Sequence, residues 1–354
     1  MLGRNAVRWF WLCQSALAGC ITHIDDESSS IGRVERDCVV PSPAGVESLG
    51  APVSLEYPDH SLWVWEALRL AAGRSVSTPS AIVESVAAAC SAGPTLTLDE
   101  QGEPVSLIAL TPAEADQNAA RVDGKWLALS PLGGFVYEGT GYLYYDHVLR
   151  GPGVFDATSL GSGLCILAPG AIQCERVGLS EQTVLFDSAG PVVNYGGLVF
   201  GEQALVYGCR PVAELQSVCT VAAAPLDRVA EQGAYQFHSS FGGWQSGLEG
   251  AASIVDELGP ITVAPYDDEY LMTTLDLFEA RVYVRRAQSP LGPFGRRIEA
   301  FDVLPSLTFF PGGGREHAAL RTSAHALAFS YTTDHPDAPG LHLVSYRIFG
   351  NFGQ

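Results

Sequence analysis

The acidic residue Glu56 precedes a tight turn that contains Asp59, near the start of the apolar, strand-like part of the chain. Two carboxyl groups on either side of a sugar can hydrolyse a glycosidic bond, one as general acid and the other as nucleophile or base. The segment 58–60, Pro-Asp-His, also has an ordinary structural explanation as a turn. Glu56 and Asp59 are therefore candidate catalytic residues, and a purely structural role stays open for both.

A second polar group, Arg315-Glu316-His317, follows the glycine-rich segment 311–314. A guanidinium can bind a carboxylate, and a histidine can polarise a hydroxyl group or transfer a proton. All three residues are candidate ligand contacts, and His317 is also a candidate catalytic residue. The alternative is a solvated loop that contains one hydrogen-bonded histidine.

Aromatic residues near glycines form a third group. Tyr195 follows Asn194 and precedes a glycine pair, and Trp244 ends the aromatic-rich segment 235–244. Aromatic faces beside hydrogen-bonding groups are typical of sites that stack on a sugar or another flat ligand, although such rings more often pack in a core. The candidate ligand contacts in this group are Tyr145, Asn194, Tyr195 and Trp244.

The elements that must position these residues recur along the chain. The segment 192–209 reads as two strands joined by a short turn, and the segments 133–145, 261–275 and 317–331 have the same form. A repeat of about sixty residues with this strand content predicts the blades of a β-propeller. With a further strand pair near 53–68, the sequence predicts an all-β, five-bladed propeller over residues 51–354 as a single domain. The last blade is expected to include N-terminal residues.

Two short helical insertions are expected between the first and second blades. Thr78-Pro79 resembles a helix start, with Ile82, Val86 and Cys90 on one face and a stop at Gly93-Pro94. Thr111-Pro112 with Glu114 predicts a second helix that begins with a capping box.

The charge of the chain limits its partners. Its 354 residues include 39 acidic and 20 basic residues, for a formal net charge of −19. Nucleic acids and anionic membrane surfaces are therefore poor partners. The sequence also lacks an HExxH segment, a phosphate-binding loop, a dinucleotide fingerprint and a Cys-His spacing suited to a metal. We expect no cofactor and no metal site.

The first twenty residues have the features of an export signal. Arg4 and Arg8 precede a short apolar stretch, and Leu17-Ala18-Gly19-Cys20 resembles the box of bacterial lipoproteins. This predicts a signal peptide over 1–19, a lipid on Cys20 and a polar tether over 20–50. The lipid would be the protein's membrane contact, in a bacterial cell envelope, facing the periplasm or the exterior. The alternative is an ordinary secretory signal.

Six further cysteines suit an oxidising compartment. Cys165 and Cys174 flank a turn, and Cys209 and Cys219 flank the link between adjacent strands. We predict the disulfides Cys165–Cys174, Cys209–Cys219 and, by elimination, Cys38–Cys90.

Several motifs together resemble the bacterial secreted domain-of-unknown-function family 4185. They occupy the segments 109–145, 206–229, 234–244 and 282–294, and the resemblance extends over about 53–348. It implies a five-bladed propeller similar to arabinanase-like and β-xylosidase-like glycoside hydrolases, with acids around a central funnel. The expected acid of the third blade is missing, since residues 193–197 read Val-Asn-Tyr-Gly-Gly.

The function favoured by these residues is binding of a carbohydrate or similar polar ligand in the funnel. The first alternative is a glycoside hydrolase-like enzyme with an unusual acid/base pair, and the second is a structural envelope protein. The oligomeric state cannot be inferred from the sequence.

Overall fold

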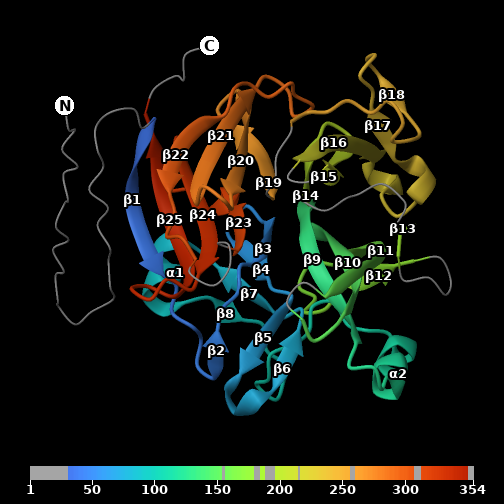
Figure 1. Ribbon diagram of the computed structural model, residues 1–354, viewed down its shortest axis with the longest axis vertical. Helices are drawn as coiled ribbons and strands as arrows, with labels where there is room; N and C mark the ends of the chain where they lie inside the picture. Colours follow the sequence, from blue (N-terminus) through green and yellow to red (C-terminus); the bar gives the residue numbers. More distant parts are fainter. Residues whose placement is uncertain are drawn as a thin grey trace, which may run out of the picture.

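The computed structural model describes residues 31–153, 156–178, 184–187, 196–213, 216–255, 260–306 and 312–349. Five antiparallel sheets stand around a common axis, which confirms the predicted five-bladed propeller (Figure 1). Asn194 and Tyr195 lie outside the described residues, as do Cys20 and the expected signal peptide.

Each blade places one strand at the axis and builds outwards. Blade one contains β3 (Val53–Glu56), β4 (Ser61–Val64), β7 (Ser80–Val83) and β8 (Thr95–Leu96). Blade two contains β9 (Trp126–Tyr137), β10 (Thr140–Arg150), β11 (Ala157–Leu167) and β12 (Glu175–Val177), with β13 (Phe186–Asp187) paired to β11. Blade three contains β14 (Gly196–Phe200), β15 (Gln203–Ala213), β16 (Gln216–Pro225), β17 (Gln236–His238) and β18 (Trp244–Gln245).

Blades four and five complete the ring. Blade four contains β19 (Ile261–Tyr266), β20 (Glu269–Asp276), β21 (Arg281–Ala287) and β22 (Ile298–Asp302). Blade five contains β23 (Gly312–Glu316), β24 (Ala326–Thr333), β25 (Gly340–Ile348) and β1 (Gly32–Val39). A small separate sheet contains β2 (Val46–Ser48), β5 (Ala67–Leu70) and β6 (Ser75–Ser77). The helices are α1 (Val86–Ala92), α2 (Pro112–Ala120) and the short 3-10 helices η1 (Ala71–Gly73), η2 (Leu226–Arg228), η3 (Gln232–Ala234) and η4 (Ala318–Leu320).

The core consists of apolar layers between neighbouring blades. Alternating residues of each strand point to opposite faces, so each blade can bury side chains against the blade before it and the blade after it. Trp63 of blade one packs with Leu343 of blade five, and Phe135 of blade two packs with Val206 of blade three. Similar layers join the other neighbouring blades, which closes the ring around the axis.

Strand β1 closes the ring, as expected from the sequence. It pairs antiparallel with β25, from Gly32 opposite Ile348 to Val39 opposite His342. The predicted tether over 20–50 is therefore wrong for residues 32–39, which are part of blade five, and for 46–48, which form β2. The alternation in Gly32–Val39 is weak because the register shifts between Val34 and Arg36, so the strand does not show a clear period of two.

All three predicted disulfides are present: Cys38–Cys90, Cys165–Cys174 and Cys209–Cys219. The first joins β1 to α1 and thus links blade five to the insertion of blade one. The other two each connect segments within one blade.

One of the two predicted helices is correct, and the other is shorter than expected. Helix α2 begins at Pro112 with the full capping box of Thr111 and Glu114. The expected helix from Thr78 is wrong over its first half, because residues 80–83 form β7 against β4. Helix α1 begins only at Val86, where the Ser85 Oγ accepts a hydrogen bond from the Ala88 N–H at 3.1 Å. The β-branched pair Ile82-Val83 favours the strand.

No helix in the described part of the chain has both the length and the apolar character needed to cross a bilayer.

Candidate functional site

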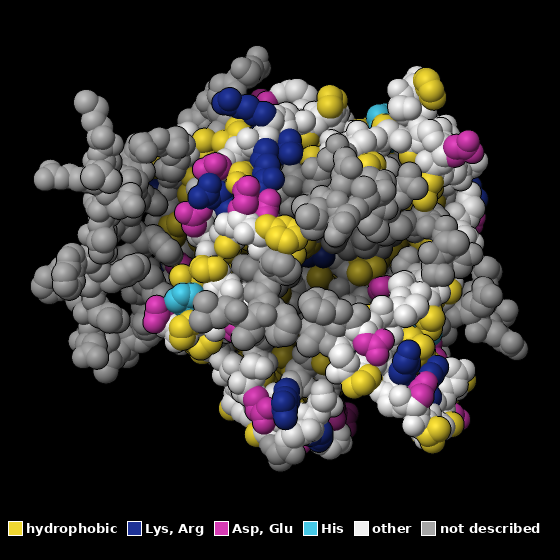
Figure 2. All heavy atoms as spheres, viewed as in Figure 1, with side chains coloured by type: hydrophobic (Ala, Val, Ile, Leu, Met, Phe, Trp, Pro, Cys, Tyr) yellow, Lys and Arg dark blue, Asp and Glu magenta, His cyan; other side chains and the backbone are white. Residues whose placement is uncertain are grey.

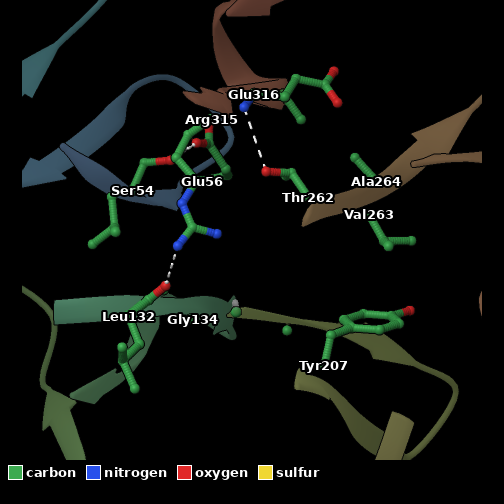
Figure 3. Close-up of a pocket in the computed structure, with 15 residues that line it drawn as sticks. Ser54, Glu56, Leu132, Gly134, Tyr207, Thr262, Val263, Ala264, Arg315 and Glu316 are labelled. Carbon is green, nitrogen blue, oxygen red and sulfur yellow. Dashed lines mark hydrogen bonds between the residues drawn. The ribbon is translucent and has the colours of Figure 1, made fainter. Parts of the chain in front are cut away.

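A cavity lies on the propeller axis, where the innermost strands of all five blades meet (Figure 3). Strands β3, β9, β14, β19 and β23 all contribute to its wall. It encloses about 70 Å³, far less than the several hundred Å³ of a typical small-molecule pocket. It can therefore take one polar group of a ligand, and the rest of that ligand would lie outside it.

Glycines from blades two and three form one side of the wall. A Cβ atom on Gly134 would come within 1.9 Å of the Tyr142 carbonyl oxygen, and Gly196 has a φ of +105°. Side chains at these two positions would clash or strain the backbone. The glycine backbone therefore forms much of this side, together with the Tyr207 ring of blade three. The other polar side chains at the cavity come from blades one, four and five: Ser54, Glu56, Thr262 and Arg315.

Glu56 is the carboxylate of blade one at the cavity. Its oxygens accept hydrogen bonds from the Ser54 hydroxyl, from the Ser61 Oγ at 3.2 Å and from the Ala319 N–H at 2.8 Å. Burial raises the pKa of Glu56, but the hydrogen bonds and the neighbouring His317 outweigh this and hold the pKa below its ordinary value. The side chain is 28% exposed. Glu56 is thus an ionised acceptor that a ligand can reach.

His317 supports this carboxylate from behind. Its ring is fully buried, with Nδ1 2.9 Å from the Ser54 Oγ and Nε2 2.7 Å from the Ser330 Oγ. Nδ1 also lies 3.7 Å from Glu56 Oε1. The imidazole therefore joins blade five to blade one and does not line the cavity. Its buried position does not agree with the direct ligand contact that was expected from the sequence.

Arg315 reaches across the axis from blade five (Figure 3). Its Nη2 donates to the Leu132 carbonyl oxygen of blade two at 3.2 Å, and its Nη1 donates to the Ile261 carbonyl oxygen of blade four at 3.2 Å. The guanidinium thus bridges three blades and brings a permanent positive charge to the cavity.

Glu316 lies beside Arg315, but its carboxyl group points away from the cavity (Figure 3). It forms a buried ion pair with Arg321. Burial raises the pKa of Glu316, and the Arg321 charge opposes this only in part. Its backbone N–H donates to the Thr262 Oγ1 at 3.4 Å, so what faces the wall is main chain.

Three other predicted site residues lie away from the cavity. Asp59 is an exposed turn residue whose carboxylate is 2.7 Å from the His60 ring. Tyr145 is fully buried between blades one and two, where its hydroxyl accepts a hydrogen bond from the Arg176 Nε at 2.9 Å. Trp244 lies on β18, the outermost strand of blade three. The structure thus brings together Glu56, Arg315 and Glu316, with His317 behind them.

Ser54, Thr262 and Tyr207 line the cavity but were not predicted from the sequence. A signal for Ser54 was present, because Ser54 and Glu56 are two residues apart on one strand and share a face. Thr262 offered no such signal, since its place opposite Glu316 depends on how blades four and five meet.

The described part of the wall can hydrogen-bond a ligand, and Glu56 is the acid that it presents to the cavity. Of the described residues that line the cavity, Glu56 and Glu316 are the acidic ones, and the carboxyl group of Glu316 is held by Arg321. The described residues also include no cluster of three or more His, Cys, Asp or Glu side chains able to hold a metal ion.

The fold is similar to that of solved glycoside hydrolases. A candidate hydrolase from Bacteroides ovatus superposes with a TM-score of 0.56 at 14% identity, over 92% of this chain and 96% of that chain. Zg3597, a family 117 glycoside hydrolase of Zobellia galactanivorans, gives a TM-score of 0.53 at 11% identity, over 90% and 91%. A GH43_1 enzyme from Xanthomonas citri in complex with xylose gives 0.50 at 12% identity, over 87% and 89%. These similarities show a shared fold.

Searches by sequence found no matching family model and no similar curated protein. The resemblance to family 4185 is therefore not supported by these searches.

Proposed function

We propose that this chain is a secreted propeller that binds a carbohydrate or a similar polar ligand at its axis and does not hydrolyse it. The main support is the chemistry of the cavity wall. Glu56 offers an ionised acceptor and Arg315 offers a cation, on a wall that also carries the hydroxyl groups of Ser54 and Thr262. Carboxylate and guanidinium groups side by side suit a ligand with several hydroxyl groups.

The choice between binding and hydrolysis depends on whether Glu316 can act as a second carboxyl group at the ligand. A glycosidase needs a second carboxyl group at the scissile bond. Glu316 is the other acid of the described wall, and its ion pair with Arg321 keeps it from a ligand. Hydrolysis stays the alternative, because proteins described as glycoside hydrolases share this fold.

The test compares ligand binding and product formation in one experiment. The full chain with Cys20→Ser, which cannot be lipidated, is applied to a glycan array, and bound glycans are titrated by calorimetry. We expect binding with no released sugar. Glu56→Gln should weaken binding about tenfold, because it removes a charged acceptor. The control is Asp59→Asn, which changes an 85% exposed carboxylate outside the cavity.

Two results would contradict the proposal. Released reducing sugar would establish the hydrolase alternative, and equal losses in Glu56→Gln and Asp59→Asn would exclude the cavity as the binding site.

Three disulfides indicate an extracellular or periplasmic protein. We further propose that a lipid on Cys20 anchors it to the membrane surface, on the basis of the lipoprotein-like sequence 17–20. Palmitate labelling of the wild type and of Cys20→Ser tests this, and equal labelling of both would exclude the anchor.

A further inference from the structure

The hairpin β17–β18 projects from the outer edge of blade three, away from the axis (Figure 1). Besides the buried Phe237, it contains three aromatic rings within a few residues: His238, Phe241 and Trp244. None of the three lines the central cavity, which is built from the inner strands.

Phe241 lies in a hydrogen-bonded turn at the tip of the hairpin. The Ser239 Oγ accepts the Phe241 N–H at 3.2 Å, and the Ser239 carbonyl accepts the Gly242 N–H at 3.0 Å. Gly242 and Gly243 have φ values of +86° and +77°, which glycine adopts without strain. The turn therefore places Phe241 at the tip of the hairpin, where it is 94% exposed. Burying such a ring against a ligand would contribute about 2 kcal/mol of favourable free energy to binding.

Below the tip, two further rings face each other across the hairpin. His238 and Trp244 are register partners, with ring centroids 5.6 Å apart in an edge-to-face arrangement. Both are partly exposed, and Trp244 also packs on the apolar layer between blades three and four. The Trp244 ring is thus supported from behind while part of it reaches solvent.

The charge around the hairpin indicates which ligand it suits. Residues 229–255 contain the acids Glu231 and Glu249 and no lysine or arginine. The space-filling view shows hydrophobic atoms at the outer end of this hairpin (Figure 2). Without basic residues, an anionic membrane or nucleic acid gains no electrostatic attraction here. A neutral ligand with a flat apolar face and hydroxyl groups fits aromatic rings that lie beside serine hydroxyls and backbone carbonyls.

We propose that the β17–β18 hairpin is a second carbohydrate-binding surface, on which Phe241 and Trp244 stack against sugar rings of a neutral glycan. This surface is separate from the central cavity, and the proposal does not depend on what the cavity binds. A glycan chain that contacts the hairpin would be held at the rim of the propeller.

The test uses the full chain with Cys20→Ser and insoluble neutral polysaccharides: xylan, mannan, cellulose and chitin. Bound protein is measured by sedimentation at high salt, where charge effects are screened. We expect the wild type to bind at least one of them and Phe241→Ala to bind about fivefold more weakly, as loss of a stacked ring predicts. Phe241→Tyr, which keeps the ring, should bind like the wild type.

Phe278→Ala is the matched control, because Phe278 is a half-exposed phenylalanine in a turn of blade four. Glu56→Gln serves as the control for the central cavity. If Glu56→Gln abolishes binding while Phe241→Ala leaves it unchanged, the cavity proposal stands and this one is wrong. Equal losses in Phe241→Ala and Phe278→Ala, or no retention of the wild type on any of the four, would also overturn it. So would loss of binding to neutral phosphatidylcholine vesicles in Phe241→Ala with polysaccharide binding intact.

Discussion

At the scale of single residues, the contact between blades five and one depends on a small polar network. His317 has a hydroxyl partner at each ring nitrogen, Ser54 from blade one and Ser330 from blade five. Glu56 accepts from the Ala319 N–H, so its carboxylate also spans the two blades. Buried polar groups are costly unless each has a partner, and here most of the partners lie across a blade boundary. The network thus determines how blades five and one pack against each other.

The charge of Glu56 predicts a pH dependence of stability. Its pKa in the folded protein lies below the ordinary value of 4.5. Such a group contributes stability above its unfolded pKa, and the contribution is lost as the pH falls through the folded pKa. We expect Glu56→Gln to lower the free energy of unfolding by about 1–2 kcal/mol at neutral pH. The difference should shrink below pH 4.5.

Urea denaturation of both proteins at neutral and acidic pH measures this. A loss that stays constant across the whole pH range would show that the ionised carboxylate is not the stabilising group. Asp59→Asn, on an exposed turn, should change stability little at either pH.

The polar positions at the axis were predictable only in part. Glu56 was predicted as an acid beside a turn and Arg315 as part of the Arg-Glu-His group, and the structure places both at the cavity. The burial of His317 could not be seen, because it depends on Trp63 and Ser330, which approach from other strands. For Tyr145, the sequence could not distinguish a ring that faces a ligand from one that packs against the next blade.

At the scale of elements, α2 is fixed to blade two by a buried ion pair. The carboxylate of Glu114 accepts two hydrogen bonds from the Arg176 guanidinium, at 2.6 and 3.0 Å. His147 Nε2 lies 3.4 Å from the same carboxylate, and burial lowers the pKa of His147. Glu114 also accepts the Thr111 N–H at the start of α2, so one side chain both caps the helix and attaches it.

Breaking this pair from one side should be costly. Arg176→Met leaves the buried Glu114 carboxylate without its cation, and we expect a loss of about 3–5 kcal/mol in unfolding free energy. The double variant Glu114→Gln/Arg176→Met removes both charges and keeps an acceptor for the Thr111 N–H, so it should recover part of that loss. Guanidinium denaturation of the wild type, both single variants and the double variant gives the coupling energy. Additive effects would contradict the ion-pair explanation.

Local signals explain which elements were predictable. The capping box of Thr111 and Glu114 is contained in four residues, and α2 forms where it was expected. Thr78-Pro79 carried a similar signal, but Thr78 instead has a φ of +43°. Its hydroxyl donates to the Ile108 carbonyl oxygen at 2.8 Å and accepts the Ile108 N–H at 3.1 Å. Pairing with β4 then outweighs the local preference in residues 80–83. The contact between Thr78 and Ile108 joins residues 30 apart in sequence, so a local sequence pattern cannot predict it.

At the scale of the whole molecule, the ring is closed by β1 and secured by the Cys38–Cys90 disulfide. The repeat along the sequence predicted the number of blades because each blade repeats the same strand pattern. The extent of the N-terminal contribution was not predictable in detail, because the weak alternation of residues 32–39 resembles a polar linker as much as a strand.

This closing disulfide should contribute more stability than either of the other two. It joins residues 52 apart, against 9 and 10 for the others. The loop-entropy model gives about 4 kcal/mol for the first and about 2.7 kcal/mol for each of the others. Paired Cys→Ser variants at Cys38/Cys90 and at Cys165/Cys174, compared by denaturation under oxidising conditions, measure the order. A larger loss from Cys165/Cys174 would contradict it.

Closure by the first strand also has a consequence for biogenesis. Asp37 of β1 meets His342 of β25, 305 residues later, so in a chain made from its N-terminus the closing strand waits for its partner until synthesis is nearly complete. Cys38 and Cys90, in contrast, both emerge early, and oxidation can join them while most of the chain is still absent. The disulfide would then hold β1 beside blade one until β25 of blade five is made and can pair with it.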